Sequence, residues 1–120
     1  MKDVILLGTD FLFTEELGSR LRGINYIVHP FDSPEDLELK LESESFPPKL
    51  MIIDIQRKET GGVDSIKKAI EKGIKVIAIG AHKDEASLSS ATEAGASLVL
   101  ANSQASRSIE NFVEQVLKSP

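Results

Sequence analysis

Residues 50–54 read Leu50-Met51-Ile52-Ile53-Asp54, four apolar residues followed by a carboxylate. An uninterrupted apolar run of this kind is typical of a β-strand that is covered on both faces. Open α/β sheets place their chemistry at the carboxyl ends of the central parallel strands. The sequence therefore predicts that Asp54 lies at the edge of a sheet where a functional site would form.

Similar apolar runs occur elsewhere along the chain, rich in Val and Ile and without alternation. With the first run they form this series: Val4–Leu7, Tyr26–Val28, Leu50–Ile53, Val76–Ile79 and Leu98–Leu100. This is the pattern of buried parallel strands. We expect a strand at each of them.

Helix-like segments separate the expected strands. The first has apolar residues at four-residue spacing from Phe13 and ends at Gly23, and the second begins with a Ser33 cap and Pro34. The third spans about 63–72, with Ile66 and Ile70 on one face. The fourth, 85–93, carries few apolar residues, so we expect it to be weakly anchored. The last carries a strong apolar stripe: Ile109, Phe112, Val113, Val116 and Leu117.

A strand followed by a helix, repeated five times, predicts a three-layer α/β sandwich around a parallel sheet. Right-handed crossovers leave few topologies, and we favour the flavodoxin-like (βα)5 arrangement with strand order 2-1-3-4-5. The chain shows no linker or internal repeat, and residues 43–48 are expected to form a loop. We therefore expect one domain over residues 1–120.

Composition excludes several classes of function. The net charge of −5 and the scattered Lys and Arg residues argue against nucleic-acid binding. The chain has no cysteine, which excludes disulfides, thiol nucleophiles and thiolate metal sites. No signal-peptide core or membrane span is visible, so we expect a soluble cytoplasmic protein that does not act at a membrane.

The predicted strand order brings polar residues to one crevice. Strands one and three are neighbours, so Asp10 and Asp54 should approach each other at the carboxyl edge, with Gly80 and Asn102 beside them. Close carboxylates share a cation, share a proton or stay apart in solvent. Oxygen ligands of this type suit Mg²⁺. Asp10 equally fits an N-cap of the helix that follows it.

On these residues the chain resembles the receiver domain of bacterial response regulators (CheY-like domains), over essentially its whole length. Asp54 stands at the phospho-acceptor position of that family. Gly62, eight residues later, matches the glycine of the following loop, and Gly95-Ala96 matches the pair before the fifth strand. Asp10 matches the second residue of the family's acidic pair.

The resemblance also implies a weak Mg²⁺ site formed by Asp10, Asp54 and Gln56, where Gln56 would contribute its backbone carbonyl. Other positions depart from the family pattern. Thr9 replaces the first acid of the pair, Gly80 replaces a hydroxyl residue, and Asn102 replaces a lysine. The chain thus looks like a degenerate receiver, or pseudo-receiver, in which Mg²⁺ is weakly bound or absent.

A pseudo-receiver is expected to be a signalling domain of a two-component system rather than an enzyme. The resemblance implies that it acts through protein contacts on the fourth helix, fifth strand and fifth helix, with a histidine kinase or a second copy as candidate partners. Phosphorylation-driven switching would be lost or reduced. A functional phospho-accepting receiver that uses Asp54 and Mg²⁺ is one alternative, with Lys58, His82 or Lys83 supplying the missing cation. A small flavodoxin-like enzyme or ligand-binding domain is another.

Overall fold

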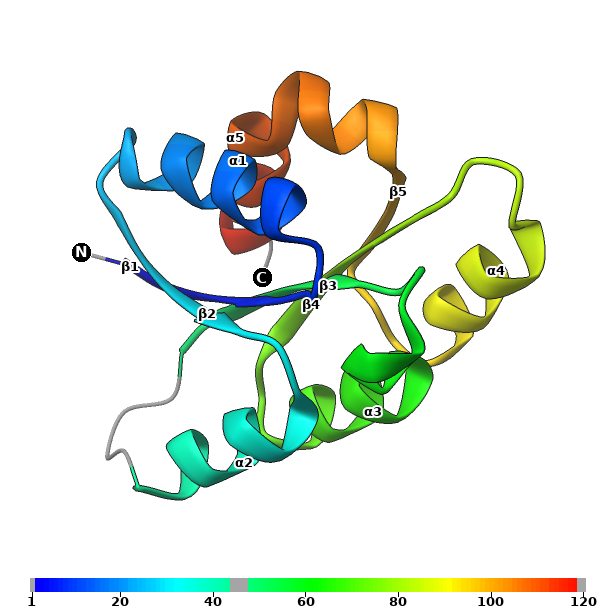
Figure 1. Ribbon diagram of the computed structural model, residues 1–120, viewed down its shortest axis with the longest axis horizontal. Coiled ribbons are helices and arrows are strands. Elements are labelled where there is room, and N and C mark those ends of the chain that lie inside the picture. The colour runs from blue at the N-terminus through cyan, green and yellow to red at the C-terminus, as the bar shows by residue number, and fades with distance from the viewer. Residues whose placement is uncertain (1, 44–47, 119–120) are drawn as a thin grey trace.

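The structure is a computed structural model that describes residues 2–43 and 48–118 (Figure 1). Within these ranges the chain forms a five-stranded sheet in the order β2-β1-β3-β4-β5, and every neighbouring pair is parallel. The strands are β1 Lys2–Leu7, β2 Tyr26–Phe31, β3 Leu50–Asp54, β4 Lys75–Gly80 and β5 Leu98–Ala101. The predicted flavodoxin-like topology is confirmed.

Helices cover both faces of the sheet, so the molecule has three layers (Figure 1). They are α1 Phe11–Arg22, α2 Pro34–Ser43, α3 Gly62–Glu71, α4 Glu85–Glu93 and α5 Asn102–Lys118, and a short 3₁₀ turn, η1, spans Lys58–Thr60. Helices α1 and α5 pack on one face, whereas α2, α3 and α4 pack on the other. Each expected helix is present. Of the loop predicted at 43–48, residues 44–47 lie outside the described part of the chain, and Ser43 ends α2.

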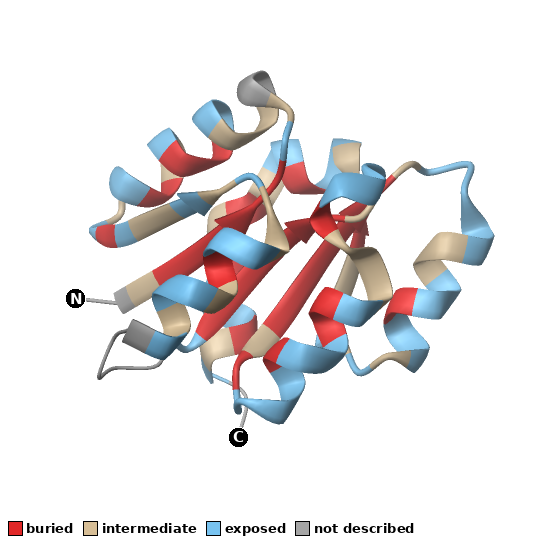
Figure 2. Cartoon of the chain, turned by 60° about the horizontal axis from the view of Figure 1, so that its bottom comes forward, coloured by how far each residue is buried: buried red, intermediate tan, exposed pale blue. Residues whose placement is uncertain are grey.

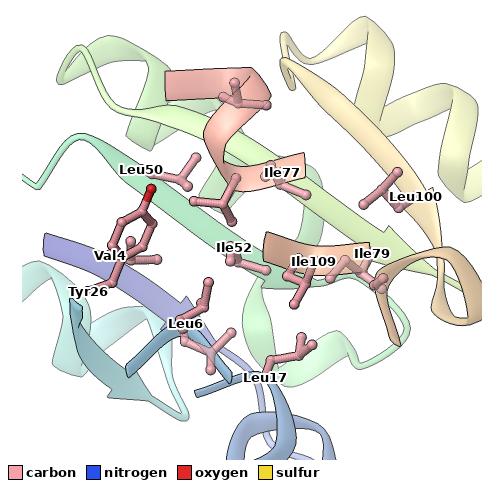
Figure 3. Close-up of a cluster of buried hydrophobic side chains, with 14 residues drawn as sticks. Val4, Leu6, Leu17, Tyr26, Leu50, Ile52, Ile77, Ile79, Leu100 and Ile109 are labelled. Atoms are coloured by element: carbon pink, nitrogen blue, oxygen red, sulfur yellow. The ribbon is translucent and has the colours of Figure 1, made fainter. Parts of the chain in front are cut away.

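The central strands are buried on both faces because helices cover both (Figure 2). Every residue of β3 is buried. On the α1–α5 side, apolar side chains from β1, β3, β4, α1 and α5 point toward one another and form a continuous core (Figure 3). Arg20 of α1 also clamps α5, since its Nε donates to Glu110 Oε2 at 3.0 Å. This packing fixes the strand ends that carry the candidate site.

Strand β2 corrects one prediction. We expected all strands to be covered on both faces, but β2 lies at the edge of the sheet, and Ile27 is 41% exposed. The strand also continues past Val28 to Phe31. His29 therefore lies within the strand, where its Nε2 is 2.8 Å from Asp3 Oδ1. An apolar sequence run does not distinguish an edge strand from a central one.

Helix α3 is buried unevenly along its apolar face. Ile66 and Ile70 were expected on one face of the helix, and the structure shows Ile66 fully buried and Ile70 38% exposed. A Cβ placed on Gly95 would lie 3.4 Å from Ile70 Cγ1, so Ile70 packs beside the turn that precedes β5.

The predicted Ser33 cap of α2 is confirmed, because the Asp36 N–H donates to Ser33 Oγ at 3.2 Å. Among the described residues, no helix is long and apolar enough to cross a membrane.

Candidate functional site

Asp54 is the last residue of β3 and lies at the carboxyl edge of the sheet. Its side chain is held by a local turn, since the Gln56 N–H donates to Asp54 Oδ1 at 3.0 Å. The residue is 2% exposed. An aspartate at a strand end often points into solvent without a function, and Asp54 does not. A buried carboxylate of this kind needs compensation from nearby groups.

The fold brings most of the predicted site residues together. A hollow of about 200 Å³ opens beside the ends of β1, β3 and β5 and is lined by Asp10, Asp54, Gln56 and Asn102. Residues from α1 and α5 complete its wall: Phe13, Glu16, Leu17, Ala105 and Ser106. Of the predicted positions that the structure describes, Thr9 and Gly80 do not line this hollow.

The electrostatics of the hollow act mainly on Asp54. Burial raises the pKa of its carboxyl above the ordinary value of 3.8. The hydrogen bond from the Gln56 N–H and the charge of Arg57 lower the pKa, whereas the charges of Asp10 and Glu59 raise it. Burial is the largest of these effects, so the folded chain disfavours an ionised Asp54.

Asp10 caps α1 in addition to lining the hollow. The Phe13 N–H donates to Asp10 Oδ1 at 3.3 Å, and the Thr14 N–H donates to the Asp10 carbonyl at 3.0 Å. A side chain that accepts from the third residue of the helix is the standard N-cap arrangement. The structure therefore gives Asp10 a structural role at the same place where the metal was predicted.

The fold is shared with known signalling domains. A protein named as a response regulator from Chloroflexus aurantiacus superposes with a TM-score of 0.86 at 21% identity, over 98% of each chain. A CheY-like receiver domain protein from Methanospirillum hungatei gives 0.80 at 19% identity, over 96% of this chain and 92% of that one. The beryllofluoride-activated NtrC4 receiver domain dimer gives 0.77 at 23% identity, over 98% of this chain and 94% of that one.

The chain has the receiver-domain fold. No protein-family model matches the sequence. No curated protein matches it either. The chemistry of the site therefore depends on what the residues of this chain supply at the receiver positions.

Gly80 is the position where the receiver resemblance expects a hydroxyl residue. The space is tight, because a Cβ on Gly80 would lie 3.1 Å from Ile55 Cγ1 and 3.1 Å from Leu88 Cδ2. Ile55 follows Asp54 in the chain, and Leu88 belongs to α4. Two apolar side chains thus cover the end of β4, so a side chain at this position would need them to move.

A cation close to the hollow is Arg57, which the sequence analysis missed. Arg57 Nη2 lies 3.9 Å from Asp10 Oδ2. The candidates proposed from sequence were Lys58, His82 and Lys83, which are exposed and, like Arg57, do not line the hollow. The signal for Arg57 was its position three residues after Asp54, within a turn that returns toward the sheet edge.

Thr60 is a second missed residue, and it holds the loop after β3. It is fully buried, and its hydroxyl is shared between the carbonyls of Asp54 and Arg57, at 2.9 Å from each. Ser65 of α3 donates to the Thr60 carbonyl. Gly61 follows with φ +83°, and a Cβ there would collide with Ser65 Oγ. The sequence signal that could have identified Thr60 was a hydroxyl residue placed between the strand-end Asp54 and the pair Gly61-Gly62.

The resemblance implies Mg²⁺, and the residues present fit that ion in a limited way. Mg²⁺ is usually held by one or two carboxylates and several waters, and Asp10, Asp54 and Gln56 line one hollow. Within residues 2–43 and 48–118, however, no group of three or more His, Cys, Asp or Glu side chains is arranged to hold a metal. Asp10, Asp54 and Gln56 would therefore bind Mg²⁺ mostly through water.

Proposed function

We propose that this chain is a receiver-like signalling domain that acts mainly through protein contacts, with phosphorylation-driven switching lost or reduced. The observation that carries the proposal is the tight packing at Gly80, where the Cβ of a hydroxyl residue would lie 3.1 Å from both Ile55 Cγ1 and Leu88 Cδ2, so that both side chains would have to shift. The receiver fold supports the signalling class. We place residues 1–120 in one cytoplasmic domain.

Energetics argue for weak coupling between Asp54 and the shape of the domain. Asn102 is neutral where the receiver resemblance expects a lysine, and Gly80 offers no hydroxyl. Hydrogen bonds to charged groups contribute about 1.5–3 kcal/mol each. Driving a two-state equilibrium from 1:99 to 99:1 needs about 5.5 kcal/mol. Two missing contacts therefore remove most of a complete switch.

The proposed partner surface consists of α4, β5 and α5. Ala91 is the buried residue of α4 in the described part of the chain, whereas α3 buries Ser65, Ile66 and Ala69, so less buried side-chain surface anchors α4. A helix of this kind is free to adapt to a bound protein. Candidate partners are a second copy of the chain and a histidine kinase. The net charge of −5 argues against nucleic acid as the partner.

One observation favours a different function. Asp10, Asp54 and Gln56 line one hollow, as a phospho-accepting receiver with Mg²⁺ would require. In that case Asp54 would accept a phosphoryl group, and the domain would switch in the ordinary way.

A phosphodonor experiment separates the two functions. The purified chain is mixed with acetyl phosphate and Mg²⁺, and intact mass and backbone amide spectra are recorded, with Asp54→Asn as the control. We expect little modification, or a modification that leaves the amide shifts of α4 unchanged. Stoichiometric, Mg²⁺-dependent modification that is lost in Asp54→Asn and shifts the α4 amides would overturn the proposal.

A further inference from the structure

The hollow at the carboxyl edge is acidic. Asp10, Glu16 and Asp54 contribute carboxylates to its wall, and among the described residues no Lys or Arg lines it. Carboxylates in one partly enclosed site repel one another, and Asp54 is nearly fully buried. An arrangement of this kind requires a positive charge nearby.

Arg57 supplies that charge from outside the wall. Its Nη2 lies 3.9 Å from Asp10 Oδ2, and the two side chains are 53% and 41% exposed. Its charge also opposes the effect of burial by lowering the pKa of Asp54. The guanidinium thus acts on both carboxylates of the predicted metal site.

The loop holds Arg57 in this place. Thr60 is fully buried, and its hydroxyl bridges the carbonyls of Asp54 and Arg57. The Thr60 N–H donates to the Arg57 carbonyl at 3.2 Å as well. The backbone of Arg57 is therefore fixed relative to that of Asp54, which limits the region that its side chain can reach.

The two oxygens of Asp10 have different neighbours. Oδ1 accepts from the Phe13 N–H in the α1 cap, whereas Oδ2 faces Arg57. A metal ion that used Asp10 through Oδ2 would come into direct conflict with the guanidinium. A metal that used Oδ1 would have to compete with the helix cap.

We propose that Arg57 is the resident counter-cation of the Asp10–Asp54 pair and that it weakens Mg²⁺ binding at this site. This inference rests on the receiver-like reading of the pocket given above. It adds a specific residue that determines how well the pocket takes a divalent cation.

Mg²⁺ titration of the purified chain tests the role of Arg57. The amide shifts of Asp10, Asp54 and Gln56 are followed in the wild type and in Arg57→Gln. We expect Mg²⁺ binding to be tighter by about fivefold or more in Arg57→Gln, since fivefold is the factor for two unit charges about 4 Å apart in a water-like medium and Mg²⁺ carries two charges. Thermal unfolding of each variant checks that the fold is retained.

Two matched variants give the control. Lys58→Gln removes the same charge from the adjacent exposed position, and Arg57→Lys keeps the charge at the site. Both should bind Mg²⁺ within about twofold of the wild type, since the charge beside Asp10 remains in each. Equal gains in Arg57→Gln and Lys58→Gln would show an effect of net charge alone and would overturn the inference. Equal affinity in the wild type and Arg57→Gln, or no binding in either, would overturn it too.

The test of Arg57 and the test of the proposed function use different measurements, so one proposal can fail while the other holds. Loss of switching is measured by phosphodonor-dependent shifts in α4, whereas the role of Arg57 is measured by the ratio of Mg²⁺ affinities. A wild-type chain that switches fully while Arg57→Gln binds Mg²⁺ more tightly would refute the proposed function and retain this inference.

Discussion

A serine at position 80 is expected to disturb the end of β4, since its Cβ would lie 3.1 Å from both Ile55 Cγ1 and Leu88 Cδ2. Overpacking of a buried site costs about 1–3 kcal/mol, so Gly80→Ser should lower the free energy of unfolding by that amount. Chemical denaturation measures the change.

The Ile55→Ala background provides the control for this prediction. Alanine removes the Cγ1 atom that the new side chain would meet, so Gly80→Ser should cost less there than in the wild type. An equal cost in the two backgrounds would show that Ile55 does not fill the position.

Asp54 is expected to make the stability of the domain depend on pH. Burial, the largest effect, raises the pKa of Asp54 above 3.8, so the folded state penalises the ionised form. The contribution of Asp54 is most favourable below the unfolded pKa and is lost as the pH rises through the higher folded pKa. Asp54→Asn, which cannot ionise, should therefore be more stable than the wild type at neutral pH.

Unfolding measured from pH 7 down to pH values below about 3.8 checks the direction, since the Asp54→Asn advantage should shrink as the wild-type carboxyl becomes protonated. An advantage that stays constant over this range would point to a cause other than ionisation.

At the scale of elements, the loop between β3 and α3 depends on one hydroxyl. Thr60→Val keeps the shape of the side chain but removes the hydroxyl donor to the Asp54 carbonyl, whereas the Arg57 carbonyl keeps the backbone N–H of residue 60. An unsatisfied buried polar group costs about 1–3 kcal/mol, and denaturation should show a loss of that size. Thr92→Val, at an exposed position of α4, should change stability by less than about 0.5 kcal/mol.

Helix α4 should open more easily than its neighbour α3. The buried residue of α4 is Ala91, whereas α3, of similar length, buries Ser65, Ile66 and Ala69. Amide hydrogen exchange should be faster in α4 by roughly an order of magnitude or more, because local stability follows buried contacts. Equal protection of the two helices would contradict the weak anchoring on which the proposed partner surface depends.

At the scale of the whole molecule, the two faces of the sheet are packed unequally. Leu21 is fully buried on the α1–α5 side. Leu37 of α2 is 7% exposed on the other side and borders two small cavities of about 20 and 10 Å³. The cost of Leu→Ala depends on how completely the side chain is surrounded and spans about 2–5 kcal/mol.

Leu21→Ala should therefore destabilise the domain near the upper end of that range and Leu37→Ala near the lower end. Chemical denaturation of both variants under the same conditions makes the comparison. A larger loss for Leu37→Ala would mean that α2 contributes more to the core than its packing indicates.

Much of the fold was predictable from local patterns. The run Leu50–Ile53 identified the central strand, and Glu85–Glu93 was predicted with the bounds that the structure has. Central strands are buried on both faces, and the sequence therefore shows them as uninterrupted apolar runs. The exposure of Ile27 and Ile70 was missed because it depends on position in the sheet and on neighbouring turns.

The site was predictable only in part. The strand order followed from the sequence, so Asp10, Asp54 and Asn102 were expected at one edge, and all three line the same hollow. Arg57 and Thr60 were missed because their roles depend on how the loop after β3 turns back. That turn is set by hydrogen bonds within residues 54–65 around the buried Thr60, rather than by a sequence period.

The sequence by itself determined the order and type of the elements, because the spacing of apolar residues within each short segment indicates whether it forms a helix or a buried strand. The tertiary structure alone decided which groups fill the space above the strand ends. Ile55 and Leu88 both lie against Gly80 because α4 packs beside the end of β4, and Arg57 reaches Asp10 because the hydrogen bonds of Thr60 hold the loop after β3. Contacts of that kind arise from three-dimensional packing, and no local pattern records them.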